Sequence, residues 1–397
     1  MSEPIAYPFV DDHGLDVSAE YLQLHEQGPI KVQLRYGEPV WLATRYDDVR
    51  LVHVDRRAVK ELGLGRDTPR VRPVVANDPS LLACMDPPRH TRVRKLASAA
   101  FALPKIRAMH GWIDGLVDEL LDGWSAAGPG ADFAEVAWTL PNLVVTGILG
   151  VPRADVPRFR SWIDTMLAGD TPMDERVTCR QALRGYILEL VEARRAEPTD
   201  DVLGALVHAR DEGDRLTEDE LVMLFESLFL GGFETTVAQM GSMFFALLSH
   251  PDRWQELVDD RSLLPAALEE LWRWVPSGRY GVPNIRWAAE DIELSGGVVV
   301  PAGEPMLPER VLANRDESVF PHAETIDFHR VDPAPHLALG FGSHHCVGAH
   351  VAHLELLLVL EEMLERFPTL QLAVPPDQVP WSATTFMRSV ESLPVAW

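Results

Sequence analysis

One segment near the carboxyl end, residues 336–349, combines a cysteine with glycines and histidines. Glycines let a loop fold tightly around a flat group, and Cys346 lies where this loop gives way to a helical pattern. The amino end of a helix favours a thiolate over a thiol, because its free N–H groups and its dipole stabilise negative charge. A thiolate at this place is suited to a soft metal ion. Two alternatives are a buried structural cysteine and a zinc site of His344, His345 and Cys346, for which no Cys-x-x-Cys pair is present.

A second group of reactive residues lies inside a long apolar helical pattern. Residues 231–236 contain two glycines, Phe233, Glu234 and two threonines. Two successive glycines cost a helix roughly 1 kcal/mol each relative to alanine, so we expect the close approach of a flat ligand or of a neighbouring helix to compensate. An acid followed by a hydroxyl could hold a water molecule and relay protons. From this segment alone, a contact between packed helices explains the pattern better than a bound ligand does.

A pair of opposite charges, Glu270 and Arg273, is three residues apart and therefore lies on one face of a predicted helix. Leucine and tryptophan residues flank the pair in the sequence, so we expect it to be partly desolvated. Truncating either partner would then leave an unpaired charge. The E-x-x-R spacing alone is also typical of ordinary surface helices.

Basic residues concentrate in one short segment, 89–95, of a chain whose net charge is 36 − 60 = −24. His90 and Arg94 of this segment are four residues apart and share one helical face. The segment either binds an anionic group or forms a solvated face of a helix. Arg286 and His344 are further candidates for contacts to an anion.

A mainly helical fold with a small amount of sheet must position these groups. Apolar spacing predicts helices over 109–124, 138–149, 156–167, 180–196, 265–276 and 347–367. Alternation and turn residues predict a β-hairpin over 31–45 and further short strands over 291–300 and 370–374.

A long central helix is predicted from its two ends. Thr217 and Glu220 form a capping-box pattern that begins the helix, and Pro251 must end it. At about 1.5 Å per residue such a helix is on the order of 50 Å long. Asp86, followed by two prolines, is expected to cap the helix that carries the basic segment.

Composition favours a single compact globular protein, with 46% apolar and 24% charged residues. The strong negative charge argues against a nucleic-acid partner. Cys84, Cys179 and Cys346 are too few for a secreted disulfide framework, and the first residues lack a signal-peptide pattern, so we expect a cytoplasmic protein. Glu226 and Glu234 interrupt the most apolar region, which predicts a buried helix and no membrane span.

Taken in order, these segments resemble the cytochrome P-450 haem-thiolate monooxygenases of the soluble bacterial type, over nearly the whole chain. The family pattern D-P-P-x-H-T-x-x-R matches residues 86–94, A/G-G-x-E/D-T matches 231–235, and E-x-x-R matches 270–273. Residues 313–316 and 326–330 resemble later landmarks that precede the cysteine loop. The resemblance implies a mainly α fold with small β-sheets. It also implies that residues 1–397 form one haem-thiolate monooxygenase domain with no fused reductase, the haem lying between the long central helix and the cysteine-loop helix.

The resemblance implies haem b (iron protoporphyrin IX) as cofactor, with Cys346 as the thiolate ligand of the iron. The other residues to which it assigns roles are His90, Arg94, Arg286, His344 and Gly348 for binding the haem and its propionates, Glu234 and Thr235 for delivering protons to dioxygen, Glu270, Arg273 and Arg330 for a structural ion-pair network, and Phe233, Val282, Pro283, Asn284, Thr385 and Phe386 for the substrate pocket. Leu339 departs from the family pattern, which usually has phenylalanine there.

The implied reaction inserts one atom of O₂ into an apolar small molecule while two external electrons reduce the other atom to water. The expected substrate is a secondary-metabolite intermediate, a terpenoid or a polyketide. Electrons would come from NAD(P)H through a small ferredoxin and its reductase, and the protein would act as a monomer. Because ferredoxins are commonly acidic, docking needs a local positive patch. The residues that could form it are Arg89, Arg92, Lys95, Lys105 and Arg107.

Two other functions remain compatible with this fold. A peroxide-driven peroxygenase would not need an acid and a hydroxyl to relay protons, so the presence of Glu234 and Thr235 favours the monooxygenase. A non-catalytic haem binder would not be expected to keep that relay either.

Overall fold

A computed structural model describes residues 4–8, 14–71, 78–167, 171–199, 201–211, 216–276, 278, 284–331, 333–382 and 387–397. The chain forms two compact units. Unit 1 comprises Met1–Pro79, Ala83–Asp86 and Ser262–Cys346, and unit 2 comprises Ser80–Leu82, Pro87–Arg261 and Val347–Trp397.

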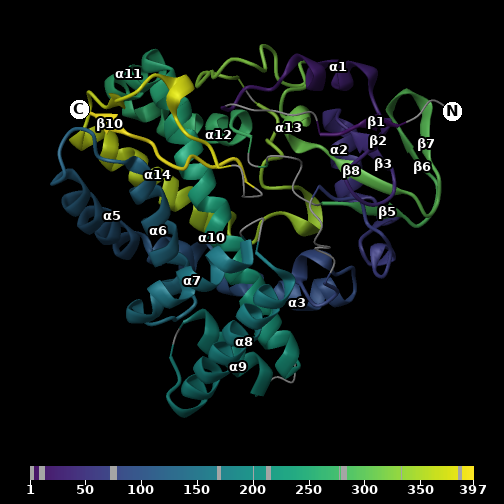
Figure 1. Cartoon of the computed structure of the whole chain (residues 1–397), viewed down its shortest axis with the longest axis horizontal. Coiled ribbons are helices and arrows are strands. Elements are labelled where there is room, and N and C mark those ends of the chain that lie inside the picture. The colour runs from purple at the N-terminus through teal and green to yellow at the C-terminus, as the bar shows by residue number, and fades with distance from the viewer. Residues whose placement is uncertain are drawn as a thin grey trace. The chain divides into compact units, whose positions relative to one another are not determined.

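Unit 1 is built on a six-stranded sheet whose strand order is β1-β2-β3-β8-β5-β4. The strands are β1 (Ile5–Ala6), β2 (Ile30–Gln33), β3 (Val40–Ala43), β4 (Ala58–Val59), β5 (Arg286–Ala288) and β8 (Pro305–Pro308). The hairpin predicted from the sequence is confirmed, because β2 pairs with β3 in antiparallel register. On its other side β3 pairs in parallel with β8. Figure 1 shows these amino-terminal and late strands side by side.

Both faces of this sheet are covered by apolar side chains that alternate along β3, β5 and β8. Leu42, Trp287 and Leu307 belong to one buried cluster. Their neighbours in sequence, Ala43 and Ala288, belong to the other. This period of two is the expected consequence of strand geometry, and it fixes the register of the sheet. The other elements of unit 1 are α1 (Ala19–Gln27), α2 (Tyr46–Val54), α12 (Leu264–Trp274), α13 (Arg310–Ala313) and the antiparallel pair β6 (Ile292–Leu294) and β7 (Val298–Val300).

Unit 2 is mainly helical. Its helices are α3 (Arg89–Ala100), α4 (Leu103–Ala108), α5 (His110–Ser125), α6 (Phe133–Ile148), α7 (Val156–Leu167), α8 (Met173–Ala196), α9 (Val202–Asp211), α10 (Glu218–Ser249), α11 (Pro251–Asp259) and α14 (Ala349–Arg366), with the strand pair β9 (Gln371–Leu372) and β10 (Val395–Ala396). The long helix α10 packs along α6, where the rings of Phe133 and Phe244 lie 4.0 Å apart.

The predicted beginning of α10 is confirmed in detail. The Thr217 hydroxyl accepts from the N–H of Glu220, and the Glu220 carboxylate accepts from the N–H of Thr217. The predicted cap of α3 is wrong. Asp86 is followed by two prolines that precede the first helical turn, and the N-cap residue is Pro88. The Asp86 carboxylate instead accepts from the N–H groups of Lys60 and Glu61, both at 2.8 Å.

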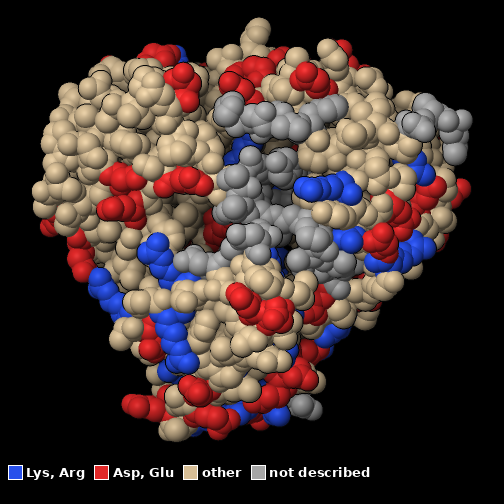
Figure 2. Space-filling view, viewed as in Figure 1, with Lys and Arg blue, Asp and Glu red and all other residues tan. Residues whose placement is uncertain are grey.

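Among the described residues, α10 is the one helix long and apolar enough to cross a membrane. Within its most apolar window, 61% is buried inside the protein, as expected for the core helix of a globular fold. Charged side chains of both signs lie interspersed over the face shown in Figure 2. Ion pairs of unit 2 include those of Arg195 with Asp211 and Glu218.

Candidate functional site

The cysteine loop of unit 1 is held by backbone hydrogen bonds and by two glycines. The N–H of Cys346 donates to the carbonyl of Leu339 at 2.9 Å, and the cysteine itself is half-buried. Gly340 and Gly342 have φ values of 76° and 69°, which only glycine adopts without strain. A Cβ atom on Gly342 would also lie 3.1 Å from the carbonyl oxygen of His53. The loop therefore needs glycine at this position for two reasons.

The position of Cys346 relative to the next helix matches the sequence interpretation. Gly348 is the N-cap residue of α14, which begins at Ala349, so the cysteine precedes the helix by three residues. Within the described residues, the ligand atoms of His344, His345 and Cys346 do not gather within 4.8 Å of one another. The arrangement thus gives no support to the zinc alternative.

The positive charges of Arg286 and Arg310 both act on a third basic side chain of unit 1, Lys60. Burial lowers the pKa of Arg286 on β5 to about 10. Burial, with help from Arg286, lowers the pKa of Lys60 to about 7. Burial also lowers the pKa of Arg310 on α13. Several positive charges brought together out of water disfavour one another, so this region is suited to a bound anion.

A chain of hydrogen bonds orients Lys60. Its Nζ donates to Asn284 Oδ1 at 3.1 Å, and the Asn284 amide nitrogen lies 3.1 Å from His53 Nε2. His53 Nδ1 lies 2.7 Å from the Val49 carbonyl and therefore carries the ring proton. Burial lowers the pKa of His53 to about 3, so the imidazole is neutral at ordinary pH. Asn284, expected in the substrate pocket, has both ends of its amide engaged in this chain.

Arg286 shows how the region would bind an anion. The residue is only 3% exposed, and its Nε and Nη2 atoms are buried without a hydrogen-bond partner in the described part of the chain. A buried guanidinium group with unused donors is costly unless a charged acceptor binds it. Carboxylates are the acceptors that fit its forked geometry. The propionates of the expected haem therefore fit this region of unit 1.

The burial of the Lys60 charge can be tested by measuring stability at different pH values. Its pKa is 10.5 in the unfolded chain and about 7 in the fold, so between these values the unfolded state binds more protons. The stability of the haem-free protein should therefore fall as pH falls from about 10.5 to about 7. Lys60→Met removes this cost and should stabilise the haem-free protein by a few kcal/mol at about pH 7. Near pH 10 the difference from wild type should be much smaller. Urea unfolding at both pH values measures it, and an equal difference at both would contradict this description of Lys60.

In unit 2, α3 presents its basic residues on two faces. His90 is buried, and Arg94, one turn later, is half-buried and donates from Nε to Ser98 Oγ at 3.2 Å. Arg92 instead forms an ion pair with Glu220, the capping-box residue of α10, through two hydrogen bonds of 3.0 and 2.5 Å. Arg89 approaches the same carboxylate at 3.4 Å. The basic segment thus has one face that anchors α10 and another that carries His90 and Arg94.

The two glycines of α10 have different surroundings. A Cβ atom on Gly232 would lie 2.8 Å from Val145 of α6, so this glycine allows close helix packing. Nothing lies within 4 Å of the corresponding position on Gly231, which is exposed. The hydroxyl of Thr235, also exposed, donates to the Gly231 carbonyl at 2.6 Å. Gly231 and Thr235 therefore form an open, polar position in an otherwise largely buried helix.

Phe233 and Glu234, next to this position, differ in burial. Phe233 is 3% exposed and packs edge-on against Trp138 of α6 at 5.9 Å and near Phe229 at 5.9 Å. Glu234 is half-buried. The other expected pocket residues, Val282, Pro283, Thr385 and Phe386, lie outside the described residues.

Glu270 of α12 binds two arginines in the interior of unit 1. Arg273 donates to both of its carboxylate oxygens at 2.7 Å, and Arg330 donates through Nε at 2.9 and 3.0 Å. Arg273 also donates to the carbonyls of Asn314 and Ala323, each at 2.8 Å. Glu270 and Arg273 are 5% and 3% exposed. This network joins α12 to the segment that leads into the cysteine loop.

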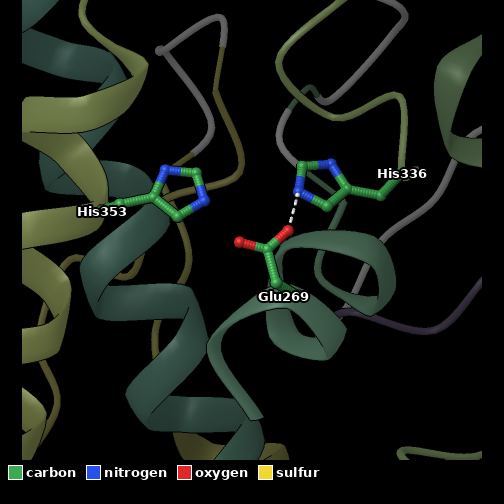
Figure 3. A group of neighbouring side chains, drawn as sticks. All are labelled: Glu269, His336 and His353. Carbon is green, nitrogen blue, oxygen red and sulfur yellow. Dashed lines mark ion pairs between the residues drawn. The ribbon is translucent and has the colours of Figure 1, made fainter. Parts of the chain in front are cut away.

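The neighbouring residue of α12, Glu269, forms an ion pair with His336 at the start of the cysteine loop. The distance between His336 Nε2 and the Glu269 carboxylate is 3.3 Å (Figure 3). The ring of Trp272 stacks on His336 with a centroid distance of 6.2 Å. Figure 3 also draws His353, whose Nδ1 lies 2.7 Å from the Ala349 carbonyl one turn earlier in α14. An ion pair therefore connects His336, the first residue of the cysteine loop, to α12.

Sequence reasoning missed His53, Lys60 and Arg310. Each is a single polar residue without a partner at helical spacing, so no local pattern distinguishes it from a surface residue. The sheet of unit 1 brings them near Arg286, since β5 lies between β4 and β8 although β4 is far from both in sequence.

Comparison with known proteins agrees with this arrangement. The family model described as Cytochrome P-450 matches residues 154–391. The chain is 41% identical to the mycinamicin IV hydroxylase/epoxidase of Micromonospora griseorubida, covering 100% of this chain and 99% of that protein. It is 43% identical to the nocardicin C N-oxygenase of Nocardia uniformis subsp. tsuyamanensis, with 99% and 98% covered.

Solved structures show the same similarity over the full fold. A hydroxylase from the leinamycin biosynthetic pathway of Streptomyces atroolivaceus superposes with a TM-score of 0.92 at 42% identity, covering 99% of this chain and 100% of that one.

Proposed function

The chain belongs to the cytochrome P-450 family, and from that premise we propose that it oxidises an apolar secondary-metabolite intermediate. Its relatives are hydroxylases, epoxidases and oxygenases, and the chain is a haem-dependent monooxygenase. Its two compact units serve this one reaction as a single monooxygenase domain. The finer points proposed below are the residue roles, the substrate class and the electron donor.

Cys346 is the residue that binds the haem iron through its sulfur. When bound, the haem supplies the activation of dioxygen and the transfer of one oxygen atom to the substrate. In unit 1, Arg286 and His344 hold propionate carboxylates by charge-assisted hydrogen bonds, and Lys60 adds positive charge nearby. In unit 2, His90 and Arg94 have the same role. The observation that carries this assignment is the buried Arg286 with unused donors in the same unit as a cysteine loop shaped by two glycines.

Glu234 and Thr235 hold and move protons during the reaction. The Thr235 hydroxyl is exposed, and its own proton is directed at the Gly231 carbonyl. Its oxygen therefore remains able to accept a hydrogen bond from water. Glu234, half-buried one residue earlier, is the acid that can supply a proton to that water.

The substrate class follows from the named relatives. One acts on mycinamicin IV and another on nocardicin C, and both reactions modify antibiotics. We therefore favour a polyketide or another antibiotic-type intermediate over a terpenoid. Titrating candidate compounds while following the spin state of the iron tests this, since a bound substrate displaces water from the iron. A panel of mycinamicin-type and nocardicin-type intermediates that leaves the spin state unchanged, with a response to terpenoids alone, would contradict it.

Electrons come from NAD(P)H through a ferredoxin and its reductase. A turnover assay should give product with these partners and much less with hydrogen peroxide alone; the reverse result would identify a peroxygenase. We place the reaction in the cytoplasm, because Cys84, Cys179 and Cys346 form no disulfide with one another.

The structure refines the proposed ferredoxin-docking patch. Lys95, Lys105 and Arg107 are exposed on α3 and α4, whereas Arg92 is bound to Glu220. Changing Lys95 and Lys105 together to glutamate should slow reduction by ferredoxin by about 10-fold at low ionic strength, and less at high salt. Stopped-flow reduction kinetics measure this effect.

The matched control changes Arg35 and Arg56, exposed on unit 1, to glutamate. It alters the net charge equally and should leave the reduction rate close to wild type. Equal slowing in both double variants would show a general charge effect and would contradict docking at α3 and α4.

A further inference from the structure

Helix α13 holds the beginning of the cysteine loop at two points. Arg310, the first residue of α13, donates from Nη1 to the carbonyl of Ala338 at 2.7 Å. Asn314, its C-cap residue, accepts from the N–H of Leu337 at 2.7 Å through its side-chain oxygen. One short helix therefore binds the backbone of two consecutive residues of the same segment.

This segment in turn holds the cysteine. The carbonyl of Leu339, the residue after Ala338, accepts the hydrogen bond from the Cys346 N–H at 2.9 Å. A second turn follows directly, because the Gly340 N–H donates to the Leu337 carbonyl at 2.9 Å. The Arg310 guanidinium lies 4.0 Å from the position of a Cβ atom on Gly340. Arg310 is thus connected to the Cys346 backbone through one residue of the loop.

Arg310 also brings positive charge to the sulfur. Arg310 Nη1 and the Cα atom of His345, the residue before Cys346, each lie 4.0 Å from the position of a Cβ atom on Gly340, so the guanidinium group lies close to the cysteine. Burial lowers the pKa of Arg310, and Glu309 and Cys346 raise it in part. Glu309 is engaged elsewhere: it accepts from the Tyr7 hydroxyl at 2.7 Å and from the Val311 N–H at 3.1 Å. An arginine keeps its charge even in such surroundings.

We propose that Arg310 is a positioning residue for the Cys346 thiolate. Through the Ala338 carbonyl it fixes the segment that binds the cysteine backbone, and its charge stabilises the negative sulfur. This inference rests on the proposed ligation of haem iron by Cys346. The hydrogen bond to Ala338 and the positive charge are separate contributions of Arg310, and two different substitutions distinguish them.

The test compares haem-loaded Arg310→Met and Arg310→Lys with wild type. Two properties are measured: the reduction potential of the iron, and the rate at which the reduced carbon monoxide complex changes from a thiolate-type to a thiol-type spectrum. Arg310→Met loses charge and hydrogen bond, so the potential should become more negative and the thiolate-type spectrum should be lost several-fold faster. Arg310→Lys keeps the charge, so the potential should return toward wild type while the spectrum is still lost faster, because the shorter side chain does not reproduce the Ala338 contact.

Lys31→Met is the matched control. It removes one positive charge from β2 of unit 1, where Lys31 pairs with Glu304, and should change neither property. Wild-type values for both properties in Arg310→Met would overturn the proposal. If Arg310→Met takes up no haem, the proposal is tested with Arg310→Lys alone. A wild-type rate of spectral change in Arg310→Lys would overturn the proposal. A faster rate at an unchanged potential would support it. A wild-type protein without a thiolate-type spectrum would instead contradict haem ligation by Cys346 itself.

Discussion

Replacing Cys346 by serine should reduce product formation to the level of a reaction without enzyme and should abolish the thiolate-type spectrum. The hydroxyl of serine is far less acidic than a thiol and gives a poor ligand for haem iron, so the electron donation that the sulfur provides is lost. Porphyrin could still bind, because Arg286 and the other basic groups of unit 1 are unchanged. The measurements are turnover with ferredoxin and the reduced carbon monoxide spectrum of the variant.

The chain contains two matched controls for this substitution. Cys84 and Cys179 are the other two cysteines, and both are buried, Cys179 within α8. Serine at either position should leave the thiolate-type spectrum intact, at the cost of some stability. Full turnover by Cys346→Ser, or loss of the spectrum in Cys84→Ser or Cys179→Ser alone, would assign the ligand to another residue.

Replacing Arg273 by methionine should destabilise the protein by about 3–5 kcal/mol, because it leaves the buried Glu270 with one arginine in place of two. The variant also loses the donors that satisfy the carbonyls of Asn314 and Ala323. Since these carbonyls lie on the segment that leads to the cysteine loop, haem uptake should fall as well. Urea unfolding of the holoprotein measures the first effect, and haem absorbance per chain measures the second.

A surface arginine provides the comparison. Arg253 of α11 pairs with Glu256 at 2.6 Å at the same spacing of three residues, but both side chains are partly exposed. Arg253→Met should cost less than about 1 kcal/mol. Equal effects at positions 253 and 273 would mean that burial of the Glu270 network contributes little.

Local pattern predicted the helices well where their ends carry chemical signals. The predicted span 156–167 coincides with α7, and the capping box places the start of α10 correctly. Helix α8 begins at Met173, seven residues before its predicted start at Arg180, because the polar first turns contain no apolar stripe. Helix α6 likewise begins earlier, at Phe133, where the Asp132 carboxylate accepts from the Ala134 N–H.

The residues of the candidate site also fall into those that local spacing could predict and those that it could not. Residues whose partners are three or four positions away, such as Glu270 and Arg273, could be found from spacing because a helix brings them together. Lys60 and Arg310 could not, because their partners lie outside helical spacing: Asn284 is 224 residues from Lys60, and Ala338 is 28 residues from Arg310. The role expected of Asp86 as a helix cap failed since two prolines delay the helix, and its carboxylate binds the backbone beside Lys60.

The most direct test of the account is the absorption spectrum of the purified protein after reduction under carbon monoxide. If the sulfur of Cys346 binds haem iron, the protein will contain one haem per chain and the spectrum will be of the thiolate type. A spectrum of the imidazole-bound type, or a protein that takes up no porphyrin, would contradict the central claim.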